Sequence, residues 1–122
     1  MPFPGPPCDT VQCCVQKAGL AHANAIYVLV EALKDCMAEQ WRNALQSDLE
    51  AKWNSMASNL ESIGNDPDAA GHAFDDLQAA DEGIGSTYQP YAGNCWEDAW
   101  AAFLAAIVQI REDFLACLGS LP

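Results

Sequence analysis

Basic residues are scarce in this sequence. Five Lys and Arg stand against 17 Asp and Glu in 122 residues, so the formal net charge is −12 at pH 7. The phosphates of nucleic acids and of anionic lipids repel such a protein, which disfavours direct binding to either. The apolar stretch 99–110 is too short to span a bilayer and is bounded by acids. We therefore expect no nucleic-acid partner and no membrane span.

The motifs of common catalytic sites are missing as well. The chain contains no GxSxG, HExxH, phosphate-binding loop or redox CxxC sequence. Asp66, Asp68 and Gly71 are spaced like the start of an EF-hand calcium loop. Ala70 and Leu77, however, stand where that loop requires oxygen ligands. We therefore expect a non-enzymatic protein with no catalytic residues, no resident metal and no cofactor.

Cysteine, in contrast, is abundant. Six cysteines are many for 122 residues, and an even number suits a disulfide framework. Disulfides persist in oxidising environments, so we expect a secreted, periplasmic or otherwise oxidised location.

The spacing of four of these cysteines predicts how they pair. Cys14 and Cys36 are 22 residues apart, and so are Cys95 and Cys117. At about 100° per residue, 22 residues end within about 40° of a whole number of turns, so each pair lies on one face of its helix. Two antiparallel helices with this spacing can be cross-linked at both ends. The predicted disulfides are Cys14–Cys117, Cys36–Cys95 and, between the remaining two cysteines, Cys8–Cys13.

Small residues accompany the four spaced cysteines on the same helix faces. In the antiparallel register set by the predicted disulfides, alanines of the first helix meet alanines of the last. Small side chains allow the close helix approach that a disulfide needs. The facing positions would be Ala32 with Ala99, Ala25 with Ala106, and Leu29 with Ala102.

The helical pattern predicts an all-α fold. From residue 11 to residue 63 there is no proline and one glycine, Gly19, and apolar residues recur at helical spacing. We expect one long helix of about 50 residues, with Asp9 as its N-cap and Gln12 completing a capping box. The alternative is two helices that meet near Ala38.

The second half of the chain predicts a short helix and a returning long one. Asp66 followed by Pro67 is typical of a helix start, and the short helix should cover 69–82. Residues 83–94 contain three glycines and a proline, which indicates a loop. A capping box at Asn94 and Glu97 should open the last helix, which should end near Leu118.

The predicted architecture is thus a disulfide-stapled antiparallel helical hairpin or bundle, with a compact four-helix bundle as the alternative. Residues 1–8 form a proline-rich tail, and residues 9–119 form a single all-helical domain.

Two surfaces are candidates for binding a partner. The first is acidic: residues 53–110 contain nine acids and no Lys or Arg. The second is an apolar and aromatic stripe on the part of the long helix beyond Cys36, which should seek a partner or form a homodimer. The candidate partner-binding residues are Asp75, Asp76, Asp81 and Glu82 on the first surface and Trp41, Leu45, Leu49 and Trp53 on the second. His22 lies on or beside the apolar helix face and is expected in the core or at its boundary.

These observations favour a non-catalytic, acidic protein-interaction module of an oxidising compartment. An inhibitor or immunity-like binder of a cationic protein is one specific version. An alternative is a thiolate metal-binding or redox protein, in which reduced Cys8, Cys13, Cys14 and Cys117 gather at one end of a bundle. A structural, self-assembling helical protein is a further alternative.

Overall fold

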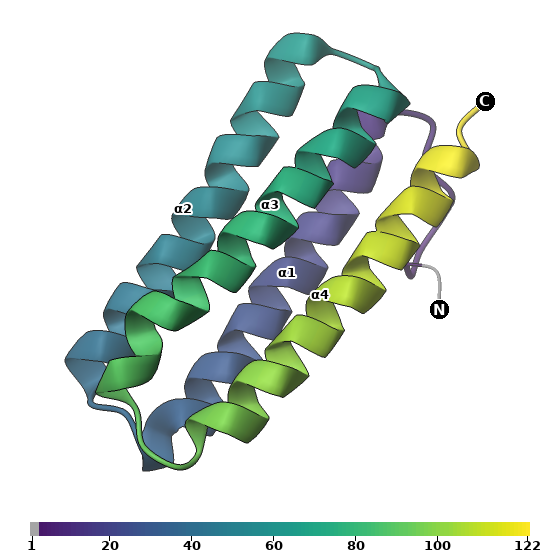
Figure 1. Cartoon of the computed structure of the whole chain (residues 1–122). Coiled ribbons are helices and arrows are strands. Elements are labelled where there is room, and N and C mark those ends of the chain that lie inside the picture. Colours follow the sequence, from purple (N-terminus) through teal and green to yellow (C-terminus); the bar gives the residue numbers. More distant parts are fainter. Residues whose placement is uncertain (1–2) are drawn as a thin grey trace.

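The computed structural model describes residues 3–122 and is almost entirely helical (Figure 1). Its described residues form four α-helices and two short 3₁₀ turns. In chain order they are α1 (Val11–Ala32), η1 (Leu33–Asp35), α2 (Glu39–Ile63), α3 (Pro67–Tyr88), η2 (Gln89–Tyr91) and α4 (Trp96–Gly119).

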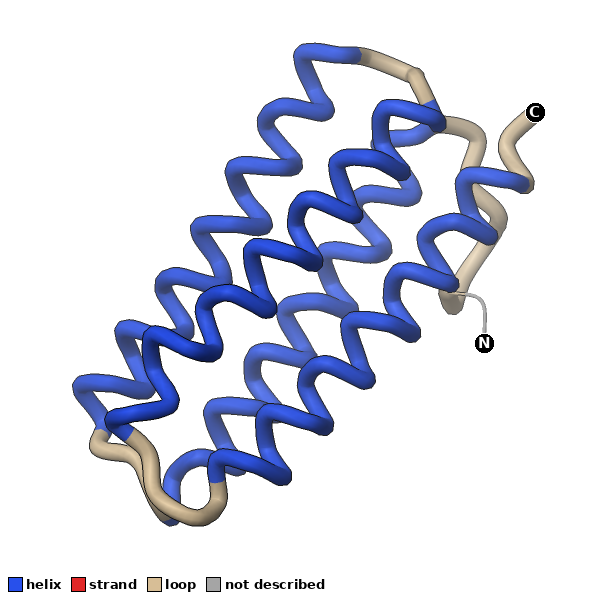
Figure 2. The backbone as a smooth tube through the Cα atoms, in the orientation of Figure 1, coloured by secondary structure: helices blue, strands red, loops and turns tan. Residues whose placement is uncertain are grey.

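The helices run up and down in an antiparallel four-helix bundle (Figures 1 and 2). Packing is most extensive between α1 and α4 and between α2 and α3. The α2–α3 turn lies at the same end as both chain termini, and the α1–α2 and α3–α4 connections lie at the opposite end. The compact four-helix bundle is therefore the correct version of the predicted all-α fold.

The prediction of a single long helix is wrong. The chain turns back between Ala32 and Glu39, although no glycine or proline stands there. Tertiary interactions hold this turn. The N–H of Gly93 donates a hydrogen bond to the carbonyl of Cys36 at 2.8 Å, and Met37 forms an isolated β-bridge with Ala92. Turning back also buries the apolar stripe of α2, which a straight helix would leave in water.

The predicted loop at 83–94 begins too early. Helix α3 continues to Tyr88, because Ile84, Gly85 and Tyr88 are buried against the bundle. Gly85 allows the indole of Trp100 to approach the helix, since a Cβ at this position would lie 2.5 Å from that ring. Packing therefore outweighs the low helix propensity of glycine here.

Of the three N-cap residues predicted from the sequence, the structure confirms one. Asp66 caps α3 by accepting hydrogen bonds from the N–H groups of residues 68 and 69. Thr10, and not Asp9, caps α1 by accepting from the N–H of Cys13. At α4 the cap position is Cys95, without a side-chain hydrogen bond, so the predicted capping box at Asn94 does not form.

One disulfide joins α1 to α4 directly, and a second joins Cys36, which follows η1, to Cys95, which precedes α4. The structure contains Cys14–Cys117, Cys36–Cys95 and Cys8–Cys13, which are the pairings that the spacing predicts. Between the two long-range disulfides, alanines of both helices line a shared apolar depression together with Leu29 and Phe103.

The described part of the tail is anchored rather than extended away from the bundle. Phe3 packs against the core, Cys8 is buried, and the Lys17 ammonium donates a hydrogen bond to the carbonyl of Pro6. Residues 1–2 of the predicted tail lie outside the described residues. No described helix is sufficiently long and apolar to cross a membrane.

Candidate functional site

A groove between α1 and α2 is the main candidate for a binding site. Its volume is about 510 Å³, which is within the range usual for ligand pockets. Apolar side chains of both helices form most of it, and polar groups stand at its edges. The lining residues are Gln12, Val15, Gln16, Gly19, Leu20, His22, Ala23, Ile26, Glu50, Trp53, Asn54, Ala57 and Glu61.

Trp53 lies against α1 because residue 19 is glycine. A Cβ at Gly19 would lie 3.0 Å from the indole Nε1 of Trp53, so a larger residue would push the ring away. The ring of Trp53 stacks on the imidazole of His22, with their centroids 4.9 Å apart. Beneath it, Phe74 of α3 meets Trp53 edge to face. The aromatic floor of the groove is thus fixed from three helices.

A buried polar pair lies under this floor. His22 of α1 and Asp81 of α3 are 1% and 0% exposed, and His22 Nε2 lies 2.8 Å from Asp81 Oδ2. Phe103 of α4 contacts the edge of the imidazole. Together with Trp53 of α2, one side chain from each helix meets in this layer of the bundle.

The environment of Asp81 opposes its ionisation. Burial raises the pKa of its carboxyl group above the usual value, while the hydrogen bond and the charge of His22 act in the opposite direction. Neighbouring Glu82 raises this pKa further and Lys52 lowers it. The second carboxyl oxygen, Oδ1, is buried and has no hydrogen-bond partner among the described residues. The pair ties α1 to α3 across the core and keeps His22 in place beneath Trp53.

The edges of the groove are acidic. Glu50 and Glu61 both come from α2 and are exposed, and none of the described lining residues is Lys or Arg. At the end near the α2–α3 turn, the side-chain amide of Gln12 donates a hydrogen bond to the carbonyl of Leu60 at 3.2 Å. Leu20, on the α1 wall, is 77% exposed.

The structure divides the predicted acidic surface. Asp75, Asp76 and Glu82 are exposed on α3, and Asp75 accepts a hydrogen bond from Arg111 at 2.7 Å. Asp81 is completely buried, so its assignment to a solvent-facing binding surface is wrong. It belongs to the apolar face of α3 because it follows Phe74 and Leu77 at helical spacing.

The predicted aromatic stripe is also divided. Leu45 and Leu49 are fully buried, so they are core residues and not an open dimer surface. Trp41 is half-buried and stacks on Tyr91 with ring centroids 3.7 Å apart. Trp53 is half-buried and is the member of the stripe that lines the groove.

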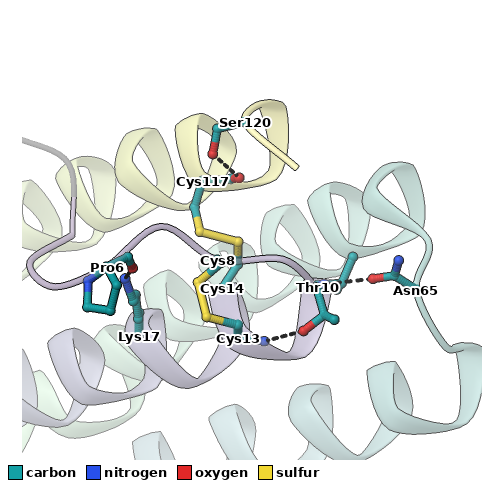
Figure 3. The surroundings of a disulfide bond; sticks show 10 residues. Pro6, Cys8, Thr10, Cys13, Cys14, Lys17, Asn65, Cys117 and Ser120 are labelled. Carbon is teal, nitrogen blue, oxygen red and sulfur yellow. Dashed lines mark hydrogen bonds between the residues drawn. A yellow bond between two sulfur atoms is a disulfide. The ribbon is translucent and has the colours of Figure 1, made fainter. Parts of the chain in front are cut away.

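The end of the bundle that holds the termini carries a cluster of sulfur atoms (Figure 3). The Sγ atoms of Cys8, Cys14 and Cys117 all lie within 4.8 Å of one another, although they belong to two different disulfides. Cys8 and Cys14 are buried, whereas Cys13 and Cys117 are half-buried. The four cysteines gather at one end as in the thiolate alternative, but here they are paired in two disulfides, whereas that alternative requires free thiols.

Sequence patterns alone did not identify the groove. The floor of the groove depends on the contact between His22 and Asp81 of α3. The groove exists because the chain turns back after α1 and places α2 beside it. One signal for the pair was present: Ala70, Phe74, Leu77 and Asp81 share one helix face, which places this acid inside. No protein-family model, curated protein or solved structure matches the chain. Its function must therefore be argued from its own residues.

Proposed function

We propose that this protein is a non-catalytic binding module that holds a cationic amphipathic helix of a partner protein in the α1–α2 groove. The observation that carries the proposal is the composition of the groove, which combines an aromatic and aliphatic floor with acidic edges and no described basic residue. Amphipathic helices commonly bind in such grooves through their apolar face.

The apolar wall supplies a reason for a partner to bind. Leu20 is 77% exposed beside Trp53 and Ala23. Covering a leucine side chain contributes about 1.5–3 kcal/mol, so this residue alone can account for a measurable part of an affinity. The half-buried indole of Trp53 offers a flat surface for a further apolar or cationic side chain.

The acidic edges supply selectivity. Glu50 and Glu61 are 11 residues apart on one helix, which separates them by roughly 16 Å at 1.5 Å per residue. A partner helix with Lys or Arg at a similar separation can place one cation near each carboxylate. The net charge of −12 attracts such a partner from a distance and repels a second copy of this chain.

The buried pair is assigned a positioning role. His22 is 1% exposed and is engaged by Asp81 and by the ring of Trp53. It therefore supports the floor of the groove without contacting the partner. The three disulfides indicate an oxidising compartment, and we propose that the protein acts after secretion or in a periplasm.

Charge-matched variants test this proposal. Glu50→Gln with Glu61→Gln removes two charges from the groove, and Asp76→Asn with Glu82→Gln removes two exposed charges from α3. The probe is a synthetic amphipathic helix of Lys and Leu, with binding followed by calorimetry. We expect the groove variant to bind about fivefold more weakly, which corresponds to about 1 kcal/mol for two exposed charge pairs. The α3 variant should change affinity by less than about twofold.

An apolar pair of variants gives a second comparison. Leu20→Ser should weaken binding by about tenfold or more, because covering the leucine no longer contributes. Val108→Ser changes an exposed apolar residue on α4, far along the chain from the groove, and should have no effect. Equal losses in the groove variants and their controls would show non-specific attraction and would reject the groove as the site. Absence of any binding by the wild-type protein would reject the proposed function.

A further inference from the structure

The sulfur cluster at the end that holds the termini has a geometry close to that of a thiolate metal site. Three Sγ atoms, those of Cys8, Cys14 and Cys117, lie within 4.8 Å of one another. Around a tetrahedral Zn²⁺ with Zn–S bonds of about 2.3 Å, neighbouring sulfurs are separated by about 3.8 Å. Two of these sulfurs, those of Cys14 and Cys117, are bonded to each other in the oxidised protein and must separate after reduction to meet this requirement, while the Cys8 sulfur already lies within 4.8 Å of both. Cys13, whose sulfur is bonded to that of Cys8, is available as a fourth ligand.

We propose that Cys8, Cys13, Cys14 and Cys117 form a site for Zn²⁺ or a similar thiophilic divalent ion when a dithiol reductant has opened their two disulfides. Each disulfide takes up two electrons and two protons from the dithiol, which is itself oxidised to a disulfide. The four resulting thiols then bind the metal through sulfur and release their protons to the solvent. This metal site is independent of the proposed groove function. It requires reduced cysteines, and its residues do not line the groove.

The surroundings of the cluster favour thiolates. Cys13 and Cys14 lie in the first turn of α1, where the helix dipole stabilises negative charge and where no acid is present. A depression beside the cluster is lined by Cys8 and Cys117, together with Lys17, whose ammonium favours thiolates, and Asp113, whose carboxylate opposes them. That depression, of about 310 Å³, reaches Cys8 and Cys117 from the solvent.

The ligands also come from parts of the chain that the metal would hold together. Cys8 belongs to the segment before α1, and Cys117 belongs to the last turn of α4. Both are joined to α1 by disulfides in the oxidised protein (Figure 3). A metal bound to all four thiols would hold together the segment before α1, α1 itself and the end of α4. It would thus replace the two disulfides that join these segments.

The opposite end of the bundle supplies the control. Cys36 and Cys95 are there alone, and among residues 3–122 no third Cys, His or acid completes a metal-ligand group with them. Two double variants therefore each retain four thiols. Cys36→Ser with Cys95→Ser leaves the cluster intact, and Cys8→Ser with Cys117→Ser removes half of its ligands.

The experiment uses full-length protein reduced with a dithiol, which is then exchanged for a water-soluble phosphine. Cd²⁺ is added, and the ultraviolet charge-transfer band of cadmium thiolate reports binding. We expect one ion per chain in the wild type and in the Cys36→Ser, Cys95→Ser variant. The Cys8→Ser, Cys117→Ser variant should bind at least about tenfold more weakly, since even the loss of a supporting group beyond the ligands costs 10–100-fold.

A second readout guards against binding by an unfolded chain. Zn²⁺ should raise the melting temperature of the reduced wild type and of the Cys36→Ser, Cys95→Ser variant, and should leave the Cys8→Ser, Cys117→Ser variant unchanged. Equal binding by the two double variants would overturn the proposal. So would a reduced protein that Zn²⁺ does not stabilise, or disulfides of the cluster that a dithiol does not open.

Discussion

The two closest helix pairs of this bundle are held together by different means. Helices α1 and α4 are far apart in the sequence, meet through alanines and are cross-linked by two disulfides. Helices α2 and α3 are neighbours in the sequence, are joined by a short turn around Asp66 and have no cross-link between them. Their contact depends on large buried side chains such as Leu49 and Phe74. Disulfides thus add to burial in the α1–α4 pair, which also buries large residues such as Phe103 and Ile107, whereas burial without a cross-link secures the other pair.

Two polar contacts extend this comparison to the whole bundle. The contact between His22 and Asp81 connects α1, a member of the disulfide-linked helix pair, to α3 through the core. Tyr88, at the end of α3, donates a hydrogen bond from its phenol to the carboxylate of Asp48 on α2. The groove lies between α1 and α2, where one member of each pair meets the other. Its shape therefore depends on both means of stabilisation.

The largest expected effect is the loss of a buried ring from the pair without cross-links. Phe74 is fully buried and contacts Phe114 and Trp53. Phe74→Ala should lower the free energy of unfolding by about 3–5 kcal/mol, through lost burial and the cavity that remains. Urea unfolding measures this value. A loss of less than about 1 kcal/mol would show that burial between α2 and α3 matters less than we conclude.

Removal of a cross-link should have a somewhat smaller effect. Cys36→Ala together with Cys95→Ala opens the disulfide that closes a span of 59 residues. The free energy of unfolding should fall by about 2–4 kcal/mol, mainly because the unfolded chain gains freedom. The bundle should still form, since the Cys14–Cys117 disulfide remains. A variant that no longer melts cooperatively would show that this disulfide specifies the fold as well as stabilising it.

The contact between Tyr88 and Asp48 should give a moderate and pH-dependent effect. Tyr88→Phe should cost about 1.5 kcal/mol at neutral pH, as expected for a hydrogen bond to a charged acceptor. The carboxylate of Asp48 and burial raise the pKa of Tyr88 from 10.0 to about 12. The folded protein therefore keeps this proton at a pH where the unfolded chain has lost it.

The sign of this effect follows from the raised pKa. The stabilisation by Tyr88 is complete below pH 10 and is lost as the pH rises towards about 12. The difference in unfolding free energy between the wild type and Tyr88→Phe should shrink over that range. A difference that stays constant up to pH 12 would contradict the contact with Asp48.

The smallest effect concerns the turn that joins α2 to α3. Asp66→Ala removes the side chain that accepts hydrogen bonds from two N–H groups of the first turn of α3. The expected cost is about 1 kcal/mol in thermal or urea unfolding. Ser86→Ala, on the exposed side of the same helix, is a suitable control and should change stability by less than about 0.5 kcal/mol.

The same contrast between the helix pairs explains how much the sequence predicts. The pairing of α1 with α4 is indicated by two equal cysteine spacings and a matching set of alanines. The alanine pattern depends on helix periodicity alone, whereas Cys36 lies beyond the end of α1 and still pairs with Cys95. The turn after Ala32 could not be found in this way. Cys36 and Met37 of this turn contact Gly93 and Ala92, which are about 55 positions away in the sequence. No local signal in the sequence marks the turn.

The site was predictable only in part for a related reason. The sequence indicates that His22 lies in the core or at its boundary, and the structure buries it. Charge alone groups Asp81 with the exposed acids, although its spacing from Phe74 and Leu77 places it on the apolar face of α3. A single long helix would leave Leu45 and Leu49 open to a partner, whereas the turn after α1 buries them in the bundle. The error about the turn therefore produced the error about the surface.

The binding proposal is tested most directly by locating a cationic helix on the protein. In a nuclear magnetic resonance titration with the Lys and Leu peptide, the indole N–H of Trp53 and the backbone amide of Gly19 report on the groove floor, where the two residues are in contact. We predict that their signals and those of Leu20 and Ala23 shift most and saturate together. Shifts concentrated on Asp75, Asp76 and Glu82 of α3, with Trp53 and Gly19 unchanged, would contradict the proposal and place binding on the acidic surface.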